Sequence, residues 1–218
     1  MNYTTLFFDL DDTIYPAASG LWTAIRGRIG QYMHERLGIP ADRVGDLRRQ
    51  YFEQYGTALR GIEANYRVDR EDYLAYVHNV RLADFIGPDP GLRAALEALP
   101  ARKLIFTNAD AAHALRVMDV VGVRECFSGI VDINAMAPHC KPERAAFEAA
   151  LRLAGESDPR RCVMIDDLPR TTKAAREVGM FSILFGADAP AADADAALKD
   201  WQQLGDALTR GNSYTLQT

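Results

Sequence analysis

The sequence has 218 residues, of which 48% are hydrophobic and 25% are charged, which is the composition of an ordinary globular protein. A net charge of −5, from 25 Lys and Arg against 30 Asp and Glu, argues against a nucleic-acid polymer as partner, because such partners bind basic surfaces. No run of residues approaches the roughly 20 apolar residues of a membrane helix, and the three dispersed cysteines form no CxxC pair. We therefore expect a cytoplasmic protein that binds neither membranes nor nucleic acids.

The predicted elements begin with a short buried strand. Residues 4–10 form an apolar run rich in aromatic side chains that ends in acidic residues, as expected for a buried strand leading into a loop. The next section is predicted to be helical, because apolar residues recur at helical spacing over the segments 21–37, 41–55 and 70–82. Asp69, with an acidic residue three positions later, is typical of an N-cap for the third segment.

From residue 87 onward, predicted helices alternate with apolar strands. The helices span 91–99, 111–121, 142–154 and 169–178, and the strands span 103–107, 129–133, 162–165 and 181–185. Strands that alternate with helices of this length indicate βαβ units and a parallel sheet that is buried on both faces. A segment rich in Ala, Asp and Pro at 186–197 is predicted to be a linker to a last helix at 197–208.

These elements predict an α/β fold with a Rossmann-like, doubly wound parallel sheet core and an inserted all-helical cap. The first strand must join the same sheet as the later strands, so the helical section is an insertion between them. We expect the core to comprise residues 1–16 and 86–218, and the cap to comprise residues 17–85. Ligands of open α/β sheets bind outside the carboxyl ends of the strands, which is where we expect the cap to lie.

Reactive or ligating side chains stand at four junctions between the predicted strands and their loops or helices. They are Asp9 and Asp11, Thr107 and Asn108, Lys141, and Asp166 and Asp167. Because the carboxyl ends of parallel strands meet at one edge of a sheet, we expect these side chains to converge there. Two carboxylates at one point can divide their roles, one as an ionised nucleophile and the other as the group that exchanges a proton with the leaving group.

The acidic members of this set predict a metal site formed by Asp9, Asp11, Asp166 and Asp167. Like charges about 4 Å apart repel by roughly 4 kcal/mol per pair at an effective dielectric constant near 20, so four carboxylates need a cation. Oxygen ligands without His or Cys select Mg²⁺ rather than zinc, and Mg²⁺ is therefore the expected cofactor. Lys141 supplies a second positive charge.

The remaining members predict phosphate binding by Thr107, Asn108 and Lys141. A hydroxyl, an amide and nearby backbone N–H groups can stabilise charge on the oxygens of a transferring phosphoryl group, and a lysine ammonium can pair with one of these oxygens. The predicted chemistry is phosphoryl transfer on a small phosphorylated metabolite.

The four segments resemble the four motifs of the haloacid dehalogenase superfamily of phosphohydrolases, namely Asp9-Leu10-Asp11-Asp12-Thr13, Phe106-Thr107-Asn108, Lys141-Pro142 and Ile165-Asp166-Asp167. The resemblance implies that Asp9 attacks phosphorus and forms an aspartyl phosphate, and that Asp11 protonates the leaving alkoxide and then activates water. It also implies that Mg²⁺ is held by Asp9, the Asp11 backbone carbonyl and the Asp166-Asp167 pair, with Asp167 favoured as the direct ligand. Thr107 and Lys141 would bind the phosphoryl oxygens. The dehalogenases of the superfamily lack the second aspartate, so Asp11 favours a phosphatase.

The inserted section suggests a class of substrate. One interpretation places Thr57 and Arg60 over the site on a glycine-bounded turn, with aromatic side chains such as Tyr55 stacking on a base. The other interpretation is that Tyr51 and Tyr55, four residues apart, form a helix face packed inside the cap. Together with the stretch that ends in Tyr15, this segment resembles the pyrimidine 5′-nucleotidase branch of the superfamily. The resemblance implies nucleoside monophosphates as substrates, with Tyr15, Tyr55, Thr57 and Arg60 as specificity residues.

Two alternatives stay open at this stage. A sugar-phosphate phosphatase or a phosphomutase would share the aspartyl phosphate, and a phosphomutase would need a second phosphate pocket, for which Arg60 or Arg67 is available. A non-enzymatic phosphoacceptor switch also uses a carboxylate cluster, a Thr and a Lys, but the order of the motifs disfavours it.

The histidines are expected to be packed or solvated side chains on helices, at His34, His78 and His113, and His139 is a weaker candidate for the site.

Overall fold

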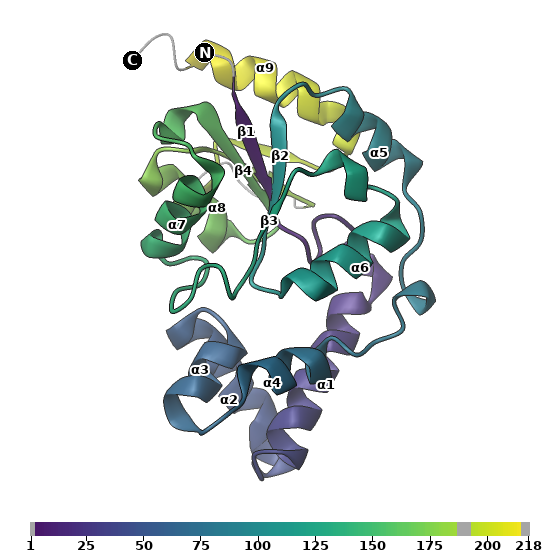
Figure 1. Ribbon diagram of the computed structural model, residues 1–218, viewed down its shortest axis with the longest axis vertical. Helices are drawn as coiled ribbons and strands as arrows, with labels where there is room; N and C mark the ends of the chain where they lie inside the picture. The colour runs from purple at the N-terminus through teal and green to yellow at the C-terminus, as the bar shows by residue number, and fades with distance from the viewer. Residues whose placement is uncertain (1–2, 187–192, 215–218) are drawn as a thin grey trace. The chain divides into compact units, whose positions relative to one another are not determined.

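Figure 1 shows the computed structural model, which describes residues 3–186 and 193–214. The chain divides into two compact units, the core unit of Met1–Ala18 with Ile86–Thr218 and the cap unit of Ser19–Phe85. None of the helices in the described ranges has the length and hydrophobicity that a transmembrane segment requires. The cysteines at positions 126, 140 and 162 are all free thiols.

The core unit is built on a parallel sheet whose strands, in the described part of the chain, run in the order β3-β2-β1-β4-β5-β6. The strands are β1 (Thr5–Phe8), β2 (Arg102–Phe106), β3 (Ile130–Val131), β4 (Cys162–Asp166), β5 (Phe181–Phe185) and β6 (Ala196–Leu198). All neighbouring strands pair in parallel. The order reverses between β1 and β4, which is the position where sheets of this kind open a crevice for ligands.

Helices cover both faces of this sheet. They are α5 (Pro90–Glu97), α6 (Ala111–Val121), α7 (Arg144–Ala154), α8 (Pro169–Val178) and α9 (Leu204–Tyr214), with 3-10 turns at Arg124–Cys126, Pro159–Arg161 and Trp201–Gln203. In Figure 1, α7 and α8 lie on one side of the sheet, and α5 and α6 lie on the other. The predicted α/β fold with a doubly wound parallel sheet is thereby confirmed.

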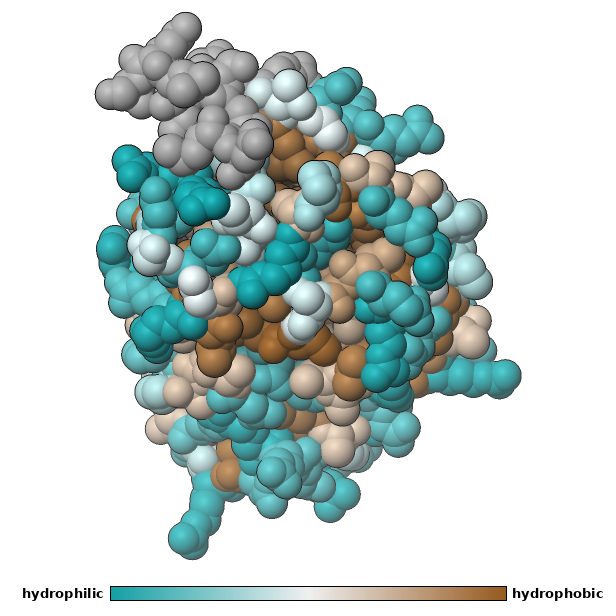
Figure 2. Space-filling model, turned by 45° about the horizontal axis from the view of Figure 1, so that its top comes forward, coloured by the Kyte–Doolittle hydropathy of each residue, from teal (hydrophilic) through white to brown (hydrophobic). Residues whose placement is uncertain are grey.

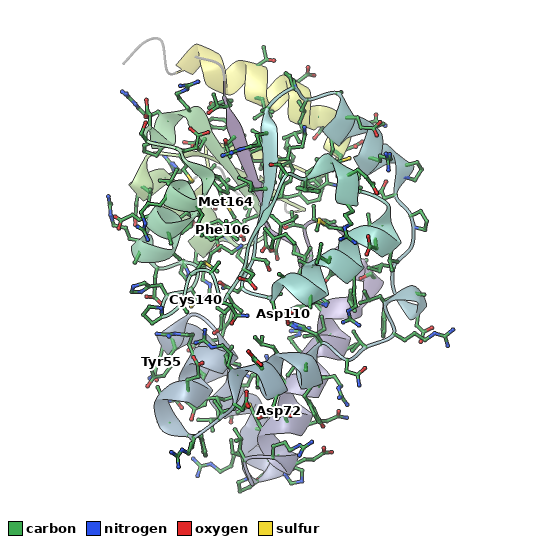
Figure 3. All side chains as sticks on the ribbon, viewed as in Figure 1. Tyr55, Asp72, Phe106, Asp110, Cys140 and Met164 are labelled. Atoms are coloured by element: carbon green, nitrogen blue, oxygen red, sulfur yellow. The ribbon has the colours of Figure 1, made fainter. Side chains whose placement is uncertain are left out.

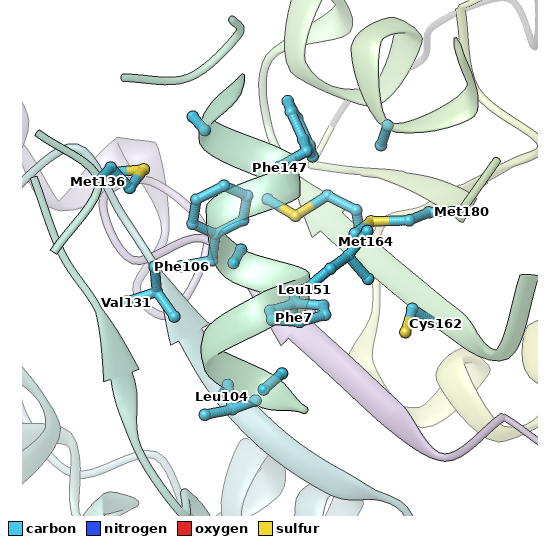
Figure 4. Close-up of a cluster of buried hydrophobic side chains, with 14 residues drawn as sticks. Phe7, Leu104, Phe106, Val131, Met136, Phe147, Leu151, Cys162, Met164 and Met180 are labelled. Atoms are coloured by element: carbon cyan, nitrogen blue, oxygen red, sulfur yellow. The ribbon is translucent and has the colours of Figure 1, made fainter. Parts of the chain in front are cut away.

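Alternating side chains of β1 pack on the two opposite faces of the sheet. Phe7 joins a buried cluster with α7 and α8, where Phe106 meets Phe7 and Phe147 edge to face (Figure 4). Phe8 points the other way and contacts the rings of Phe127 and Trp201. Full burial of each large apolar side chain contributes roughly 1.5–3 kcal/mol, so these rings hold the central strand firmly on both sides. The end of β1 is consequently a rigid base for the residues that follow it.

The end of the chain departs from its predicted structure. Residues 196–198 form the edge strand β6, whereas a linker was expected over 186–197, of which residues 187–192 lie outside the described part of the chain. An Ala- and Asp-rich segment has low strand propensity, and pairing with β5 overrides that preference. The last helix, α9, begins at Leu204 after a 3-10 turn, not at residue 197.

Every regular element described in the cap unit is a helix. After a 3-10 turn at Ala17–Ser19, the elements are α1 (Leu21–Glu35), α2 (Ala41–Tyr55), α3 (Ala58–Asn65) and α4 (Arg70–Val77), followed by a 3-10 turn at Leu82–Asp84. Asp69 caps α4, as predicted, by accepting hydrogen bonds from two backbone N–H groups of its first turn. The helix predicted over 70–82 ends earlier, at Val77.

The predicted glycine-bounded turn after residue 55 is shorter than expected, because the chain bends only at Gly56, whose φ is 84°, and Thr57, and residues 58–65 form helix α3. Thr57 is its N-cap, and the Thr57 hydroxyl accepts a hydrogen bond from the Arg60 backbone N–H at 3.1 Å. Gly61 lies inside the helix, where a Cβ atom would overlap the ring of Tyr51 on α2. The glycine therefore serves close packing between α2 and α3.

On the face of the molecule shown in Figure 2, hydrophilic and hydrophobic residues are interspersed. Leu153, on α7, is the one large hydrophobic side chain classed as exposed among the described residues. Apolar side chains scattered singly are ordinary for a protein surface and give no ground for a docking face.

Candidate active site

The candidate site begins where β1 and β4 end. Phe8 pairs with Ile105 on β2 and with Ile165 on β4, so one residue further along the chain Asp9 and Asp166 stand level. The Asp9 backbone N–H donates to the Ile165 carbonyl at 2.8 Å, which extends the pairing of the two strands up to the first aspartate. The sheet register, not loop geometry alone, therefore brings these carboxylates together.

A buried cluster of charges occupies this edge of the sheet. Asp9, Asp166 and Asp167 each place a carboxylate oxygen within 4.8 Å of the others. The Lys141 ammonium donates to Asp9 Oδ1 at 2.6 Å and to Asp166 Oδ2 at 2.7 Å. The Lys141 side chain is 3% exposed and that of Asp166 is 1% exposed, so water screens these contacts weakly.

The pKa values in the cluster show that its negative charge is not fully balanced. Burial raises the pKa of Asp9 well above its ordinary value, and the carboxylates of Asp166 and Asp167 raise it further against the opposing effect of Lys141. Burial, followed by the charge of Asp166, raises the pKa of Asp167 to about 7. Burial works to lower the pKa of Lys141, but its two carboxylate partners prevail and raise it. Three carboxylates thus face one ammonium.

Asp166 and Asp167 differ in their contacts. Asp166 Oδ1 accepts from the Leu168 backbone N–H at 2.9 Å, and its Oδ2 accepts from Lys141, so each oxygen has a donor. Asp167 is half-buried and belongs to the same oxygen cluster. The donor atoms of the cluster are carboxylate oxygens with a surplus of negative charge, which Mg²⁺ prefers as ligands. The residues present therefore fit that ion.

Asp11 lies beside this cluster and is held by two neighbours. Its Oδ1 accepts a hydrogen bond from the Tyr15 hydroxyl at 2.5 Å and lies 3.2 Å from His113 Nε2. Between Asp11 and Tyr15 the chain turns at Asp12, whose φ of 59° is in the left-handed region that Asp tolerates better than most residues. Burial, and then the charge of Asp11, raise the pKa of Tyr15, so its phenol keeps its proton.

Thr107 and Asn108 follow β2 and have different partners. The Thr107 side chain is buried, and its oxygen accepts from the Ala109 backbone N–H at 3.0 Å, which fixes the hydroxyl in place. The Asn108 amide oxygen accepts from the Lys141 backbone N–H at 2.9 Å, and its amide nitrogen donates to the Lys141 carbonyl at 3.0 Å. Both polar atoms of the Asn108 side chain thus hold the Lys141 backbone, and a contact of its second amide N–H with phosphate stays a prediction.

The other residues singled out from the sequence have the following surroundings. Tyr15, predicted as a specificity residue, is a buried residue of the core unit whose hydroxyl contacts Asp11. His139 Nδ1 lies 2.9 Å from Glu143 Oε2, and the His139 side chain is 42% exposed. In the cap unit, Tyr51 is buried against Gly61, which supports the packed helix face.

Tyr55, Thr57 and Arg60 belong to the cap unit, where Figure 3 labels Tyr55. Tyr55 is half-buried and meets the Tyr51 ring edge to face. The Thr57 oxygen caps α3, and Arg60 Nε has no hydrogen-bond partner within the described ranges. Their predicted roles in specificity remain predictions.

His113, expected to be a packed or solvated histidine, is packed and also contacts Asp11. This residue is buried on the first turn of α6, and Asp110, labelled in Figure 3, caps that helix by accepting from the His113 backbone N–H at 2.8 Å. A usable signal was present: a helix that starts directly after the end of β2 turns its first residues toward the same sheet edge as Asp11. The histidine was read only as one residue of a helical pattern.

The comparisons with known proteins agree with this geometry. The sequence model of the haloacid dehalogenase-like hydrolases matches residues 3–179. The chain belongs to this hydrolase family. The family resemblance seen in the four motifs is thereby confirmed.

Three proteins illustrate the range of those to which the chain is similar. The chain is 28% identical over 194 residues to Phosphate metabolism protein 8 of Saccharomyces cerevisiae; the match covers 82% of this chain, which spans only 60% of that relative's length. The β-phosphoglucomutase of Clostridium difficile has a TM-score of 0.62 at 18% identity and full coverage of both chains. The HAD-hydrolase YfnB of Bacillus subtilis, solved with magnesium bound, has a TM-score of 0.60 at 17% identity, covering 95% of this chain and 99% of that one.

Proposed function

We propose that this haloacid dehalogenase-like hydrolase is a Mg²⁺-dependent phosphomonoesterase that acts through an aspartyl phosphate on Asp9. The observation that carries the proposal is the buried Asp9 carboxylate, held 2.6 Å from the Lys141 ammonium in a cluster of oxygen ligands. Asp11, two residues further on, supplies the second carboxylate that phosphate ester hydrolysis needs for proton transfer.

The reaction takes two steps that share these residues. An Asp9 oxygen attacks phosphorus, the bond from phosphorus to the ester oxygen breaks, and Asp11 gives its proton to the departing alkoxide. Asp11 then takes a proton from water, which attacks the phosphorus of the aspartyl phosphate and releases Asp9 and inorganic phosphate. Asp11 thus ends each cycle in the protonation state in which it began.

Two side chains at this edge, Lys141 and Thr107, offer donors to the phosphoryl oxygens. Lysine has three N–H bonds, and Lys141 directs two of them to Asp9 and Asp166, so the third is available to a phosphoryl oxygen. The Thr107 hydroxyl, whose oxygen is fixed by Ala109, has a proton to donate. Asn108 acts through Lys141, by holding its backbone from both sides.

The residues that would hold Mg²⁺ are Asp9, Asp167 and the Asp11 backbone carbonyl, with Asp166 closely involved. Asp167 is favoured as a direct ligand, because both oxygens of Asp166 already accept hydrogen bonds. When bound, the ion supplies positive charge that offsets the surplus of the cluster and polarises a phosphoryl oxygen. The magnesium-bound YfnB, a protein of similar fold, supports the choice of metal.

The presence of Asp11 favours phosphatase chemistry over dehalogenase chemistry. A dehalogenase of this superfamily needs no such acid, whereas a phosphatase needs one to protonate its alkoxide leaving group.

For the substrate, we propose a nucleoside monophosphate, on the resemblance to the pyrimidine 5′-nucleotidases. Tyr55 and Arg60 are the cap residues that support it, since a half-buried ring and a guanidinium Nε without a hydrogen-bond partner in the described part of the chain suit a base and an anion. Free thiols favour a reducing compartment, and we place the activity in the cytoplasm.

A sugar phosphate is the alternative substrate, and the full-length likeness to a β-phosphoglucomutase supports it. A phosphate-release screen over nucleoside monophosphates and sugar phosphates, with Mg²⁺ and then with EDTA, tests both proposals. We expect release from pyrimidine nucleotides in Mg²⁺ only, and none from Asp9→Asn. Equal rates on sugar phosphates would refute the nucleotidase, and Asp9→Asn activity within about tenfold of the parent would refute the covalent mechanism.

A further inference from the structure

We propose that Tyr15 and His113 are positioning residues that hold the Asp11 carboxylate for its two proton transfers. The proposal rests on the proposed function, in which Asp11 is the acid and then the base. It is carried by two contacts to one atom: the Tyr15 hydroxyl and His113 Nε2 both reach Asp11 Oδ1, at 2.5 and 3.2 Å.

The Tyr15 contact is built into the loop after β1. Tyr15 follows the left-handed turn at Asp12, and its side chain is buried at 2% exposure in the core unit. A tyrosine has two side-chain torsions, and burial of the ring fixes both, so the hydroxyl has one direction in which to donate. The donor is therefore as rigid as the core that surrounds it.

The His113 contact comes from a distant segment, 102 residues further along the chain. The first turn of α6, where His113 lies, is anchored by two carboxylates: Asp110 accepts from the His113 backbone N–H, and Asp132 accepts from the Ala111 backbone N–H at 2.9 Å. The His113 side chain itself has no exposed surface. An imidazole fixed in this way can donate from Nε2 to Asp11, provided that this nitrogen carries the proton.

Two donors from different directions restrict the carboxylate more than either does alone. The Asp11 side chain turns about two torsions, and contacts from the loop and from α6 at the same oxygen fix the plane of the carboxylate group. A proton transfer loses rate quickly when the carboxylate turns out of hydrogen-bond reach of the leaving oxygen or of water. Both donors belong to the core unit, so the acid is oriented by the same unit that carries Asp9.

Two substrates with different leaving groups can distinguish a loss of Asp11 positioning from a general disturbance of the fold. An alkyl phosphate expels a basic alkoxide, which needs a proton as it leaves. A 2,4-dinitrophenyl phosphate expels a stable anion, which does not. Loss of orientation at Asp11 therefore slows the first step for the alkyl ester and spares it for the dinitrophenyl ester.

The experiment measures single-turnover release of the alcohol or phenol from both esters with the full chain and Mg²⁺. We expect Tyr15→Phe and His113→Leu to slow alkyl ester cleavage by about tenfold or more, and to change dinitrophenolate release by less than about twofold. His113→Gln, which keeps an N–H donor, should recover part of the alkyl ester rate. Asp11→Asn should show the same discrimination with a larger loss.

Tyr32→Phe is the matched control. Tyr32 is a buried tyrosine of the cap unit whose hydroxyl donates to Asp72 at 3.1 Å, so the substitution removes the same type of bond away from Asp11. We expect it to leave both rates unchanged. Equal losses on the two esters in Tyr15→Phe and His113→Leu, or no loss in either, would overturn the positioning role while Asp11→Asn still discriminates. If Asp11→Asn itself failed to discriminate, the proton-transfer role in the proposed function would fall first, and this inference with it.

Discussion

Replacing Lys141 by methionine should strongly lower the free energy of unfolding of the metal-free protein. Lower pH or added Mg²⁺ should restore part of this loss. The substitution keeps the length of the side chain but removes the ammonium that lies between Asp9 and Asp166. The side chains of these three residues are 3%, 11% and 1% exposed, so solvent cannot replace the lost charge. Removing one partner of a buried ion pair costs about 3–5 kcal/mol, because the other charge remains buried without compensation. For a chain of this size such a loss lowers Tm by roughly 10 °C.

The loss should depend on pH in a definite direction. Burial and the neighbouring carboxylates raise the pKa of Asp9, and without Lys141 nothing opposes that shift. The carboxylates of the folded variant can then take up protons near about pH 5 and escape the penalty, whereas near about pH 8 they stay charged. The deficit should therefore grow as the pH rises, and excess Mg²⁺ should reduce it by supplying positive charge to the folded state.

These effects can be measured by thermal and urea unfolding in EDTA and in Mg²⁺. The proteins compared are the parent, Lys141→Met and the control Lys173→Met, whose lysine is exposed on the surface. The control makes the same chemical change where water screens the charge, and it should stay within about 0.5 kcal/mol of the parent. If Lys141→Met were as stable as Lys173→Met in EDTA near about pH 8, the ion-pair reasoning would be refuted.

Three further predictions follow from the same structure. Asp167→Asn should stabilise the EDTA-treated protein by up to about 4 kcal/mol above neutral pH, because a folded-state pKa raised from 3.8 to about 7 costs stability as the pH rises through that window; an unchanged urea midpoint near about pH 8 would contradict it. Gly61→Ala should cost roughly 1–3 kcal/mol, since the added methyl overlaps the Tyr51 ring, and calorimetry should show a lowered transition. Asn108→Ala should lower kcat by about tenfold or more with little change in KM, because it frees the backbone of Lys141; steady-state kinetics that show only a raised KM would argue for direct substrate binding by Asn108.

Local patterns predicted the helices and strands where the signal and the tertiary structure agree. The predicted helices 111–121 and 169–178 coincide with α6 and α8, and the predicted strand 181–185 coincides with β5. The motif residues follow the strands as expected, because the register of a parallel sheet sets their ends level. In this part of the chain, propensity and packing favour the same structure.

The errors arise where a residue's role depends on a partner far along the chain. The glycine-bounded segment of residues 56–61 suggested one longer turn, and only the approach of Gly61 to Tyr51 shows that its second half belongs to a helix. The strand β6 has a composition typical of a linker, and its pairing with β5 cannot be read from its own residues. The same limit applied to the site: the start of a helix after β2 indicates the sheet edge near which His113 lies, but its contact with Asp11, 102 residues earlier, depends on the packed core.

The central place of β1 in the sheet has a consequence for how the chain is made. Thr5–Phe8 is synthesised well before its neighbour β4, which begins only at Cys162. At about 5–20 residues per second, a nascent chain carries this buried apolar strand without its second partner for roughly 10–30 s. The cap unit, one continuous stretch of helices, can complete its contacts during that interval. The cap unit can therefore form before the sheet is complete, and Asp166 comes level with Asp9 only when β4 pairs with β1.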